Sequence, residues 1–184
     1  MLLAAIMASR AERSRVKQKG PPFEAARSGK AIYLRVHGLG SMTTAPTLEA
    51  FVDQEIEAGA RQFVFDFERC DGVDSTFMGL LLGISNRLQD VDGKSVKGVV
   101  LINVDDHARK QLSSVGIDTL LTLVEGETEL PRSLKLTGLD AREVSDKDRL
   151  KLMVRAHKDL VAADERNRAK FGPFLKAIVA ELKG

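Results

Sequence analysis

The stretch Gln62-Phe-Val-Phe-Asp-Phe67 is short and almost wholly apolar, which is typical of a strand covered on at least one face in the middle of a sheet. From Ser75 onward the apolar residues recur at helical spacing, at Met78, Leu81, Leu82 and Leu88, until Asp92-Gly93 ends the pattern. A buried strand that leads into an amphipathic helix predicts an α/β unit, with Asp66 near the carboxyl end of the strand.

The same alternation of strands and helices continues on both sides of this unit. The segments before it are a hairpin around Ser28-Gly-Lys30 (strands Phe23–Arg27 and Ala31–Val36) and a helix (Pro46–Ile56). The segments after it are a strand (Val96–Ile102), a helix (Asp105–Val115) and a strand (Thr119–Val124). Helices inserted between strands require parallel neighbours, whereas the hairpin is antiparallel. The predicted fold class is therefore α/β with a mixed central sheet in the order ββαβαβαβ, over residues 23–124.

The two ends of the chain differ from this body in composition. Residues 1–22 carry five basic side chains and one acidic one, which predicts a flexible basic arm. Such an arm can touch membranes or nucleic acid, but a solvated tail is the favoured interpretation. Its apolar start precedes the basic run Arg10–Lys19, the reverse of the order in a secretory signal, so no export signal is expected.

Residues 125–144 are polar and turn-like, which predicts a linker. The remaining residues 145–184 predict a helical hairpin, with a first helix from Ser145 to about Lys170, a break at Gly172-Pro173 and a second helix after it. Two helices of this length are too small to fold alone. We therefore expect them to pack on the sheet domain, or otherwise on a partner.

Composition excludes several classes of function. Hydrophobic residues make up 43% of the chain and charged residues 29%, as in a soluble globular protein, and no apolar run is long enough to span a bilayer. The single Cys70 excludes an internal disulfide and fits the cytoplasm. Residues 23–124 hold ten basic and fourteen acidic side chains, which argues against a nucleic-acid-binding domain.

Motifs for cofactors are also missing from the sequence. There is no Gly-x-x-x-x-Gly-Lys phosphate loop, and Gly38-Leu-Gly40 lacks the third glycine of a dinucleotide site. The three histidines, His37, His107 and His157, are far apart and have no second ligand at metal spacing, so we expect structural roles for all three. No cofactor or metal is predicted.

Polar residues concentrate where the strand Gln62–Phe67 gives way to the following helix; they are Asp66, Glu68, Asp71, Asp74, Ser75 and Thr76. Binding sites of α/β sheets lie at the carboxyl ends of strands, and a helix N-terminus favours an anion. A phosphate on Ser75 would suit the helix dipole and would add charge beside Asp71 and Asp74. The alternative is that Asp74 or Ser75 simply caps the helix.

The stretch Val64–Leu82 resembles the signature of STAS domains, particularly the bacterial anti-sigma factor antagonists. The resemblance extends over about residues 23–124 and includes Leu101-Ile-Asn103 and Val115-Gly-Ile-Asp118. It implies that the phosphorylatable serine of the family falls on Ser75. Phe77 stands where the family usually has glycine, which follows here only at Gly79.

The function that this resemblance implies is a cytoplasmic, non-enzymatic switch in transcription regulation. The chain would bind an anti-sigma factor or serine kinase of histidine-kinase-like ATPase fold while Ser75 is unphosphorylated, and release it once Ser75 is phosphorylated. Thr76 is the reserve phosphoacceptor. Phe77 and Met78 either contact the partner or point into the core. The expected partner-binding residues are Asp71, Asp74, Ser75, Thr76, Phe77 and Met78.

Two other functions compete with this one. The first is an accessory subunit of a membrane transporter or sensory complex, which also use STAS domains. The second is an Asp-based phosphotransfer enzyme or receiver built on Asp66, Asp71 and Asp74, with Asp66 as a magnesium ligand instead of a structural acid. The enzyme is disfavoured because Arg69 is the only basic residue between Val64 and Leu82 that could hold a phosphate.

Overall fold

A mixed sheet forms the centre of the structure, a computed structural model that describes residues 20–92 and 98–183. Within these residues six strands lie in the order β7-β6-β4-β2-β1-β8. The first two strands form the predicted antiparallel hairpin, and the next three pairings (β2 with β4, β4 with β6, β6 with β7) are parallel. The bounds are β1 (Phe23–Ser28), β2 (Ala31–Val36), β4 (Gln62–Asp66), β6 (Val99–Ile102) and β7 (Thr122–Leu123). The predicted α/β fold class with a mixed sheet is confirmed.

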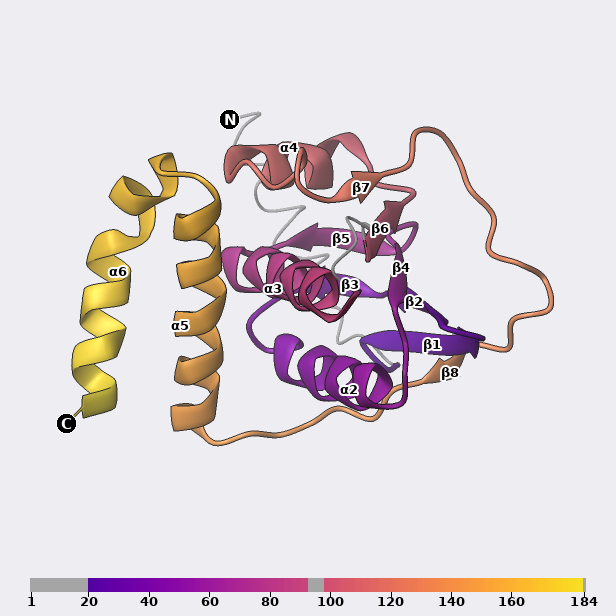
Figure 1. Cartoon of the computed structure of the whole chain (residues 1–184), viewed down its shortest axis with the longest axis horizontal. Coiled ribbons are helices and arrows are strands. Elements are labelled where there is room, and N and C mark those ends of the chain that lie inside the picture. The colour runs from indigo at the N-terminus through magenta and orange to yellow at the C-terminus, as the bar shows by residue number, and fades with distance from the viewer. Residues whose placement is uncertain (1–19, 93–97, 184) are drawn as a thin grey trace, which may run out of the picture.

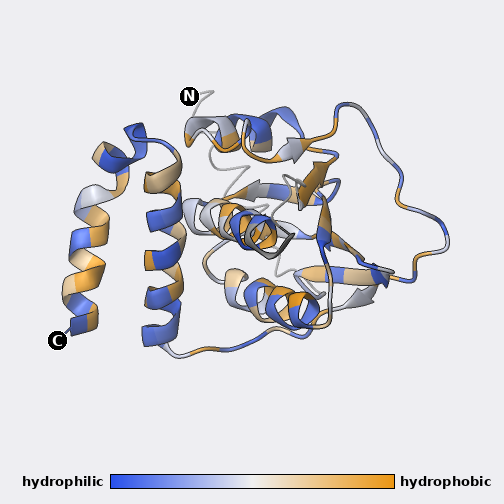
Figure 2. Cartoon of the chain, in the orientation of Figure 1, coloured by the Kyte–Doolittle hydropathy of each residue, from blue (hydrophilic) through white to orange (hydrophobic). Residues whose placement is uncertain are grey.

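One face of this sheet is buried beneath helices. Along β2 the side chains of Ile32, Leu34 and Val36 are buried while those between them are half-exposed, the alternation of a sheet covered on one side. The helices inserted between the strands are α2 (Ala45–Glu57), α3 (Ser75–Asp92) and α4 (Asp106–Ser114). Figure 2 shows hydrophilic and hydrophobic residues alternating along the helices, as expected for amphipathic helices that each bury one face.

The sequence pattern missed three short strands. β3 (Gly38–Gly40) and β5 (Cys70–Val73) form a separate parallel pair. β8 (Thr137–Gly138) pairs with β1 inside the segment predicted to be a linker. Each is two to four residues long and contains glycine, so none has enough residues to display a period of two.

The break between the two C-terminal helices was predicted at the wrong place. α5 (Asp146–Ala163) starts as expected, with the hydroxyl of Ser145 accepting from the backbone N–H of Asp148. It ends before Asp164, whose extended backbone separates it from α6 (Arg166–Lys183). A carboxylate oxygen of Asp164 accepts from the N–H of Arg166 and so begins α6. Pro173 lies inside α6, where its ring is exposed to solvent.

The C-terminal hairpin packs on the domain, as favoured from its two apolar stripes. α5 lies between α3 and α6 in Figure 1, and its contacts are with both. The division of the chain at residues 125 and 145 stays a prediction, and the basic arm of residues 1–19 lies outside the described residues. No helix in the described ranges combines the length and the apolar character needed to cross a membrane.

Candidate functional site

Helix α3 begins at Ser75, and the residue before it supplies the cap. One carboxylate oxygen of Asp74 accepts from the backbone N–H of Phe77 at 2.9 Å, and the other accepts from the N–H of Met42 at 2.8 Å. Asp74 therefore satisfies a first-turn donor of α3 and also ties down the loop that follows β3. Of the two capping candidates in the sequence, Asp74 fills the role and the hydroxyl of Ser75 is left for another partner.

That partner is a histidine from the C-terminal hairpin. Oγ of the half-buried Ser75 lies 2.9 Å from Nε2 of His157 in α5, and Nδ1 of the same ring lies 2.7 Å from the carbonyl oxygen of Met153. A carbonyl oxygen only accepts, so Nδ1 carries the ring hydrogen. In the neutral ring Nε2 is then an acceptor, and the hydroxyl of Ser75 donates to it.

The surroundings of His157 favour this neutral form. The side chain is 2% exposed, and burial lowers the pKa of the imidazole, against smaller opposing contributions from the hydrogen bond to Met153 and the carboxylate of Asp74. The ring also lies against Phe171 and Phe174 of α6, with centroids 4.9 and 4.7 Å apart. The structural role expected for His157 stays a prediction, and the fold adds that this buried histidine bonds to the candidate phosphoacceptor.

Three of the expected partner-binding residues are in the core. Thr76 is buried, Phe77 is fully buried with its ring stacked on Phe23 at 6.1 Å, and Met78 is 5% exposed. Phe77 also fills the space above Gly40, where an added Cβ would lie 2.8 Å from the ring. Thr76 is thus no accessible reserve phosphoacceptor, and Phe77 and Met78 present no surface to a partner, because all three side chains are buried.

The exposed surface beside Asp74 comes from other residues. Asp71 in β5 is exposed, and its contact with a partner stays a prediction. The sequence analysis did not identify two further exposed residues, Leu39 and Met42. Their large apolar side chains are 49% and 40% exposed. Leu39 is paired with Gly72 in the β3–β5 ladder, and the N–H of Met42 is bonded to Asp74. Both lie in a Gly- and Ser-rich segment without periodicity, so only their isolation as apolar residues could have marked them.

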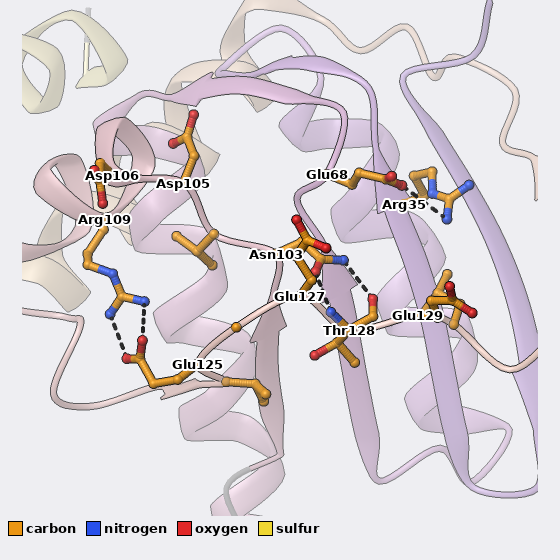
Figure 3. Close-up of a pocket in the computed structure, with 14 residues that line it drawn as sticks. Arg35, Glu68, Asn103, Asp105, Asp106, Arg109, Glu125, Glu127, Thr128 and Glu129 are labelled. Atoms are coloured by element: carbon orange, nitrogen blue, oxygen red, sulfur yellow. Dashed lines mark hydrogen bonds and ion pairs between the residues drawn. The ribbon is translucent and has the colours of Figure 1, made fainter.

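A separate cavity of about 970 Å³ opens at the carboxyl ends of the parallel strands (Figure 3). Behind it, Asp66 is 1% exposed, receives hydrogen bonds from Arg35 at 2.9 Å and Asn103 at 2.8 Å, and so serves as a structural acid. The cavity rim is rich in carboxylates, and one of them, Glu125, pairs with Arg109 at 3.2 Å. The acidic side chains of the rim are Glu68, Asp105, Asp106, Glu125, Glu127 and Glu129.

The acids of the proposed phosphotransfer site have different partners. Asp66 bonds to Arg35 and Asn103, whereas Asp74 bonds to the backbone of the first turn of α3 and of the β3–α2 loop. Across residues 20–92 and 98–183, no three His, Cys, Asp or Glu side chains are grouped so that they could hold a metal ion.

Comparisons with known proteins find similarity among solved structures. The anti-sigma factor antagonist SpoIIAA in its unphosphorylated form is 23% identical, with a TM-score of 0.46, over 56% of this chain and 88% of that chain. The Bacillus cell fate determinant SpoIIAA in its phosphorylated form is 23% identical, with a TM-score of 0.45, over 55% and 90%. A Thermotoga maritima protein assigned as an anti-sigma factor antagonist is 15% identical, with a TM-score of 0.49, over 55% and 84%.

No family model matches the sequence, and neither does any curated protein. The likeness to these solved structures is one of fold.

Proposed function

We propose that this chain is a cytoplasmic, non-enzymatic protein-binding switch of the anti-sigma factor antagonist type, controlled at Ser75. Its partner is a protein of histidine-kinase-like ATPase fold, bound while Ser75 is unmodified and released once it is phosphorylated. The observation that carries the proposal is that Asp74, and not Ser75, caps the start of α3. Because Asp74 caps the helix, the hydroxyl of Ser75 has no part in capping, and its modification would not remove the cap of α3.

Electrostatics support a switch at this position. A phosphate on the first residue of α3 would lie at the positive end of the helix dipole, which stabilises it locally. It would also add nearly two negative charges beside Asp74 and close to the exposed Asp71. The surface around Ser75 would then change in charge while the core beneath it, including Phe77, stays packed.

The same surface provides the apolar area that a protein partner needs. Leu39 and Met42 are exposed beside the cap residue Asp74. Exposed apolar side chains next to a site of variable charge form a contact whose affinity a phosphate can alter. We infer that Leu39, Met42 and Asp71 are the residues that meet the partner, in place of Phe77 and Met78.

The proposal is tested with the tagged full-length chain in extract from cells that express the gene. Proteins retained by the Ser75→Ala variant are identified by mass, and their affinities for wild type, Ser75→Ala and Ser75→Asp are then measured by calorimetry. We expect an ATPase-fold protein that binds Ser75→Asp at least about tenfold more weakly than Ser75→Ala. The matched control is Thr119→Asp, which adds the same charge at an exposed position after α4.

Equal binding of Ser75→Asp and wild type, together with no phosphate on Ser75 after incubation with the partner and ATP, would contradict the proposal. Retention of a transporter or sensory component instead would favour the accessory-subunit alternative.

A further inference from the structure

Helix α3 presents a face of small residues to α5. Ser75, Gly79 and Gly83 follow one another at intervals of four and so lie on one side of α3. A Cβ added to Gly79 would collide with the backbone carbonyl of Ala156, and one added to Gly83 would lie 2.8 Å from a carboxylate oxygen of Asp159. Because these positions lack side chains, the backbone of α5 approaches α3 closely, directly beside the candidate phosphoacceptor.

The hairpin that occupies this face also closes off the hydroxyl of Ser75. Nε2 of His157 is 2.9 Å from Oγ, and the aromatic rings of α6 lie behind the imidazole. Two side-chain atoms in hydrogen-bond contact leave no room between them for a phosphorus atom and three further oxygens. In the present orientation of the Ser75 side chain, a phosphate on Oγ would collide with the imidazole of His157.

The contact between α5 and α3 contains groups that resist burial. The pKa of His157 is lowered and the pKa of Asp159 is raised, in both cases chiefly because burial disfavours the charged form. Ser75 adds a third polar group to the same contact. An interface that buries polar and titratable groups is held less firmly than an apolar one of equal area, which suits reversible docking.

The connection to the hairpin permits such a movement. Between β7 and α5 the chain is mostly exposed and forms only the two-residue strand β8, and Figure 1 shows it running as a long loop around the domain. The hairpin is further held by an ion pair between Arg155 and Glu49 of α2 and by a hydrogen bond from Asn167 to the carbonyl oxygen of Val115, after α4. Its apolar side chains Leu152, Leu160 and Phe171 also belong to the hydrophobic core. Release of the hairpin therefore breaks these polar contacts and exposes these side chains, while the long connection keeps the hairpin attached.

We propose that the α5–α6 hairpin is an intramolecular cover over Ser75, which must leave the Ser75–Gly79–Gly83 face of α3 before a kinase or a binding partner reaches the serine. The cover would regulate the same site as the proposed function, so its biological purpose rests on that proposal. Whether the hairpin covers Ser75 is a separate question, which is tested in the chain alone, without a partner protein.

The test measures access to position 75 with a thiol probe. Ser75→Cys in the full chain is labelled with N-ethylmaleimide, alone and combined with Ala156→Glu, which places a charged side chain against Gly79. The matched control is Ala162→Glu, the same substitution at an exposed position of α5. The native Cys70 gives little background, because burial raises its pKa to about 11 and keeps the thiol protonated.

We expect Ala156→Glu to raise the labelling rate of Cys at position 75 at least about tenfold, and Ala162→Glu to leave it unchanged. Hydrogen exchange of the same proteins reports separately on the hairpin and on strands β4 and β6. If exchange in β4 and β6 shows that Ala156→Glu fails to fold, Gly79→Ala replaces it, since one methyl group there displaces α5 without adding a charge.

Equal labelling of Ser75→Cys with and without a released hairpin would overturn the cover, whether the common rate is fast or slow. The proposed function would be untouched by that result, since it depends on affinities measured for Ser75→Ala and Ser75→Asp. Conversely, a tenfold change in labelling with no effect of Ser75→Asp on any partner would leave the cover standing and remove the switch.

Discussion

Ser75 donates its hydroxyl hydrogen to Nε2 of His157 across 2.9 Å, although 82 positions separate the two residues in the sequence. The bond joins the first residue of α3 to the middle of α5, and so connects the candidate phosphoacceptor to the C-terminal hairpin. Replacing either residue removes the bond for both. The coupling energy of the two substitutions in the free energy of unfolding therefore tests directly whether the bond is present.

The first prediction is that Ser75→Ala and His157→Ala are not additive in the free energy of unfolding. Each variant alone loses the shared hydrogen bond, and the double variant loses it only once, so the coupling energy should be about 1 kcal/mol. Urea denaturation of the four proteins of the cycle measures it. Thr119→Ala replaces Ser75→Ala in the control cycle, which should be additive because Thr119 is exposed and bonds only locally, to Gly116. A Ser75–His157 cycle that is additive as well would show that the bond is absent in solution.

The second prediction concerns pH. The pKa of His157 is lower in the folded chain than its ordinary value near 6.5, because burial disfavours the imidazolium. The unfolded chain therefore takes up a proton first as pH falls, so the contribution of the neutral histidine is complete above about pH 6.5 and is lost as pH falls from there toward the folded pKa. Stability measured by urea denaturation should decrease over this range.

His157→Gln is the control for this pH dependence, since it keeps a polar side chain that does not titrate. The nearby carboxylates Asp74 and Asp159 are present in both proteins, so the difference between the two stability profiles isolates the histidine. The pKa of Asp159 is raised by burial, which moves stability the opposite way, upward as pH falls, and in a more acidic range. Parallel profiles for wild type and His157→Gln would contradict the prediction.

Most of the fold could be predicted from the sequence because its elements are long enough to show a period. The run Gln62–Phe67 and the apolar stripe after Ser75 were sufficient for β4 and α3, and the order of the remaining elements followed from the same patterns. The exit from α5 could not be found this way. Gly172-Pro173 is the stronger helix-breaking signal, yet Asp164 ends the helix because Asn167, which follows it, donates to the carbonyl oxygens of Val115 and Leu160.

The candidate site was only half predictable. Asp74 and Ser75 were identified from local chemistry, since a cap and a helix N-terminus are defined by adjacent residues. The part played by His157 depends on how α5 crosses α3, a tertiary contact that no local pattern specifies. The spacing of Ser75, Gly79 and Gly83 was the available signal for this helix contact. Three small residues at intervals of four lie on one face of a helix and let a second helix pack closely against it.

The third prediction tests the cap. Asp74→Ala should lower the free energy of unfolding by about 1 to 2 kcal/mol, because both the N–H of Phe77 and that of Met42 lose their acceptor. Asp74→Asn should recover about half of the loss, since the amide oxygen still accepts one of the two bonds. Asp71→Ala, at an exposed position in β5, is the matched control and should change stability by less than about 0.5 kcal/mol. Equal effects at the two positions would show that Asp74 does not cap α3.

The fourth prediction is that neither Mg²⁺ nor ATP changes the melting temperature of the full chain. The carboxylate of Asp66 is occupied by Arg35 and Asn103, and a cation could bind it only by displacing a guanidinium. Thermal unfolding with and without each compound, followed by calorimetry, measures this. Micromolar affinity that disappears in Asp66→Asn would instead support the phosphotransfer alternative.

The last prediction is that the hairpin opens without the sheet. Its helices rest on α3 through a contact that includes Ser75, His157 and Asp159, whereas β2 and β4 are central strands with fully buried side chains such as Leu34 and Phe65. Backbone amides of α5 and α6 should therefore exchange with solvent through a partial opening of lower free energy than global unfolding.

Leu160→Ala removes a fully buried side chain from α5 and should speed exchange in α5 and α6 by lowering the free energy of that opening by about 2 to 4 kcal/mol. The amides of β2 and β4 should keep slower exchange than the hairpin in both proteins. Lys158→Ala, at an exposed position two residues earlier, should leave every rate unchanged. If hairpin and sheet amides instead exchange at one common rate in wild type and in Leu160→Ala, the two parts unfold as a single unit, and Ser75 becomes accessible only when the whole chain unfolds.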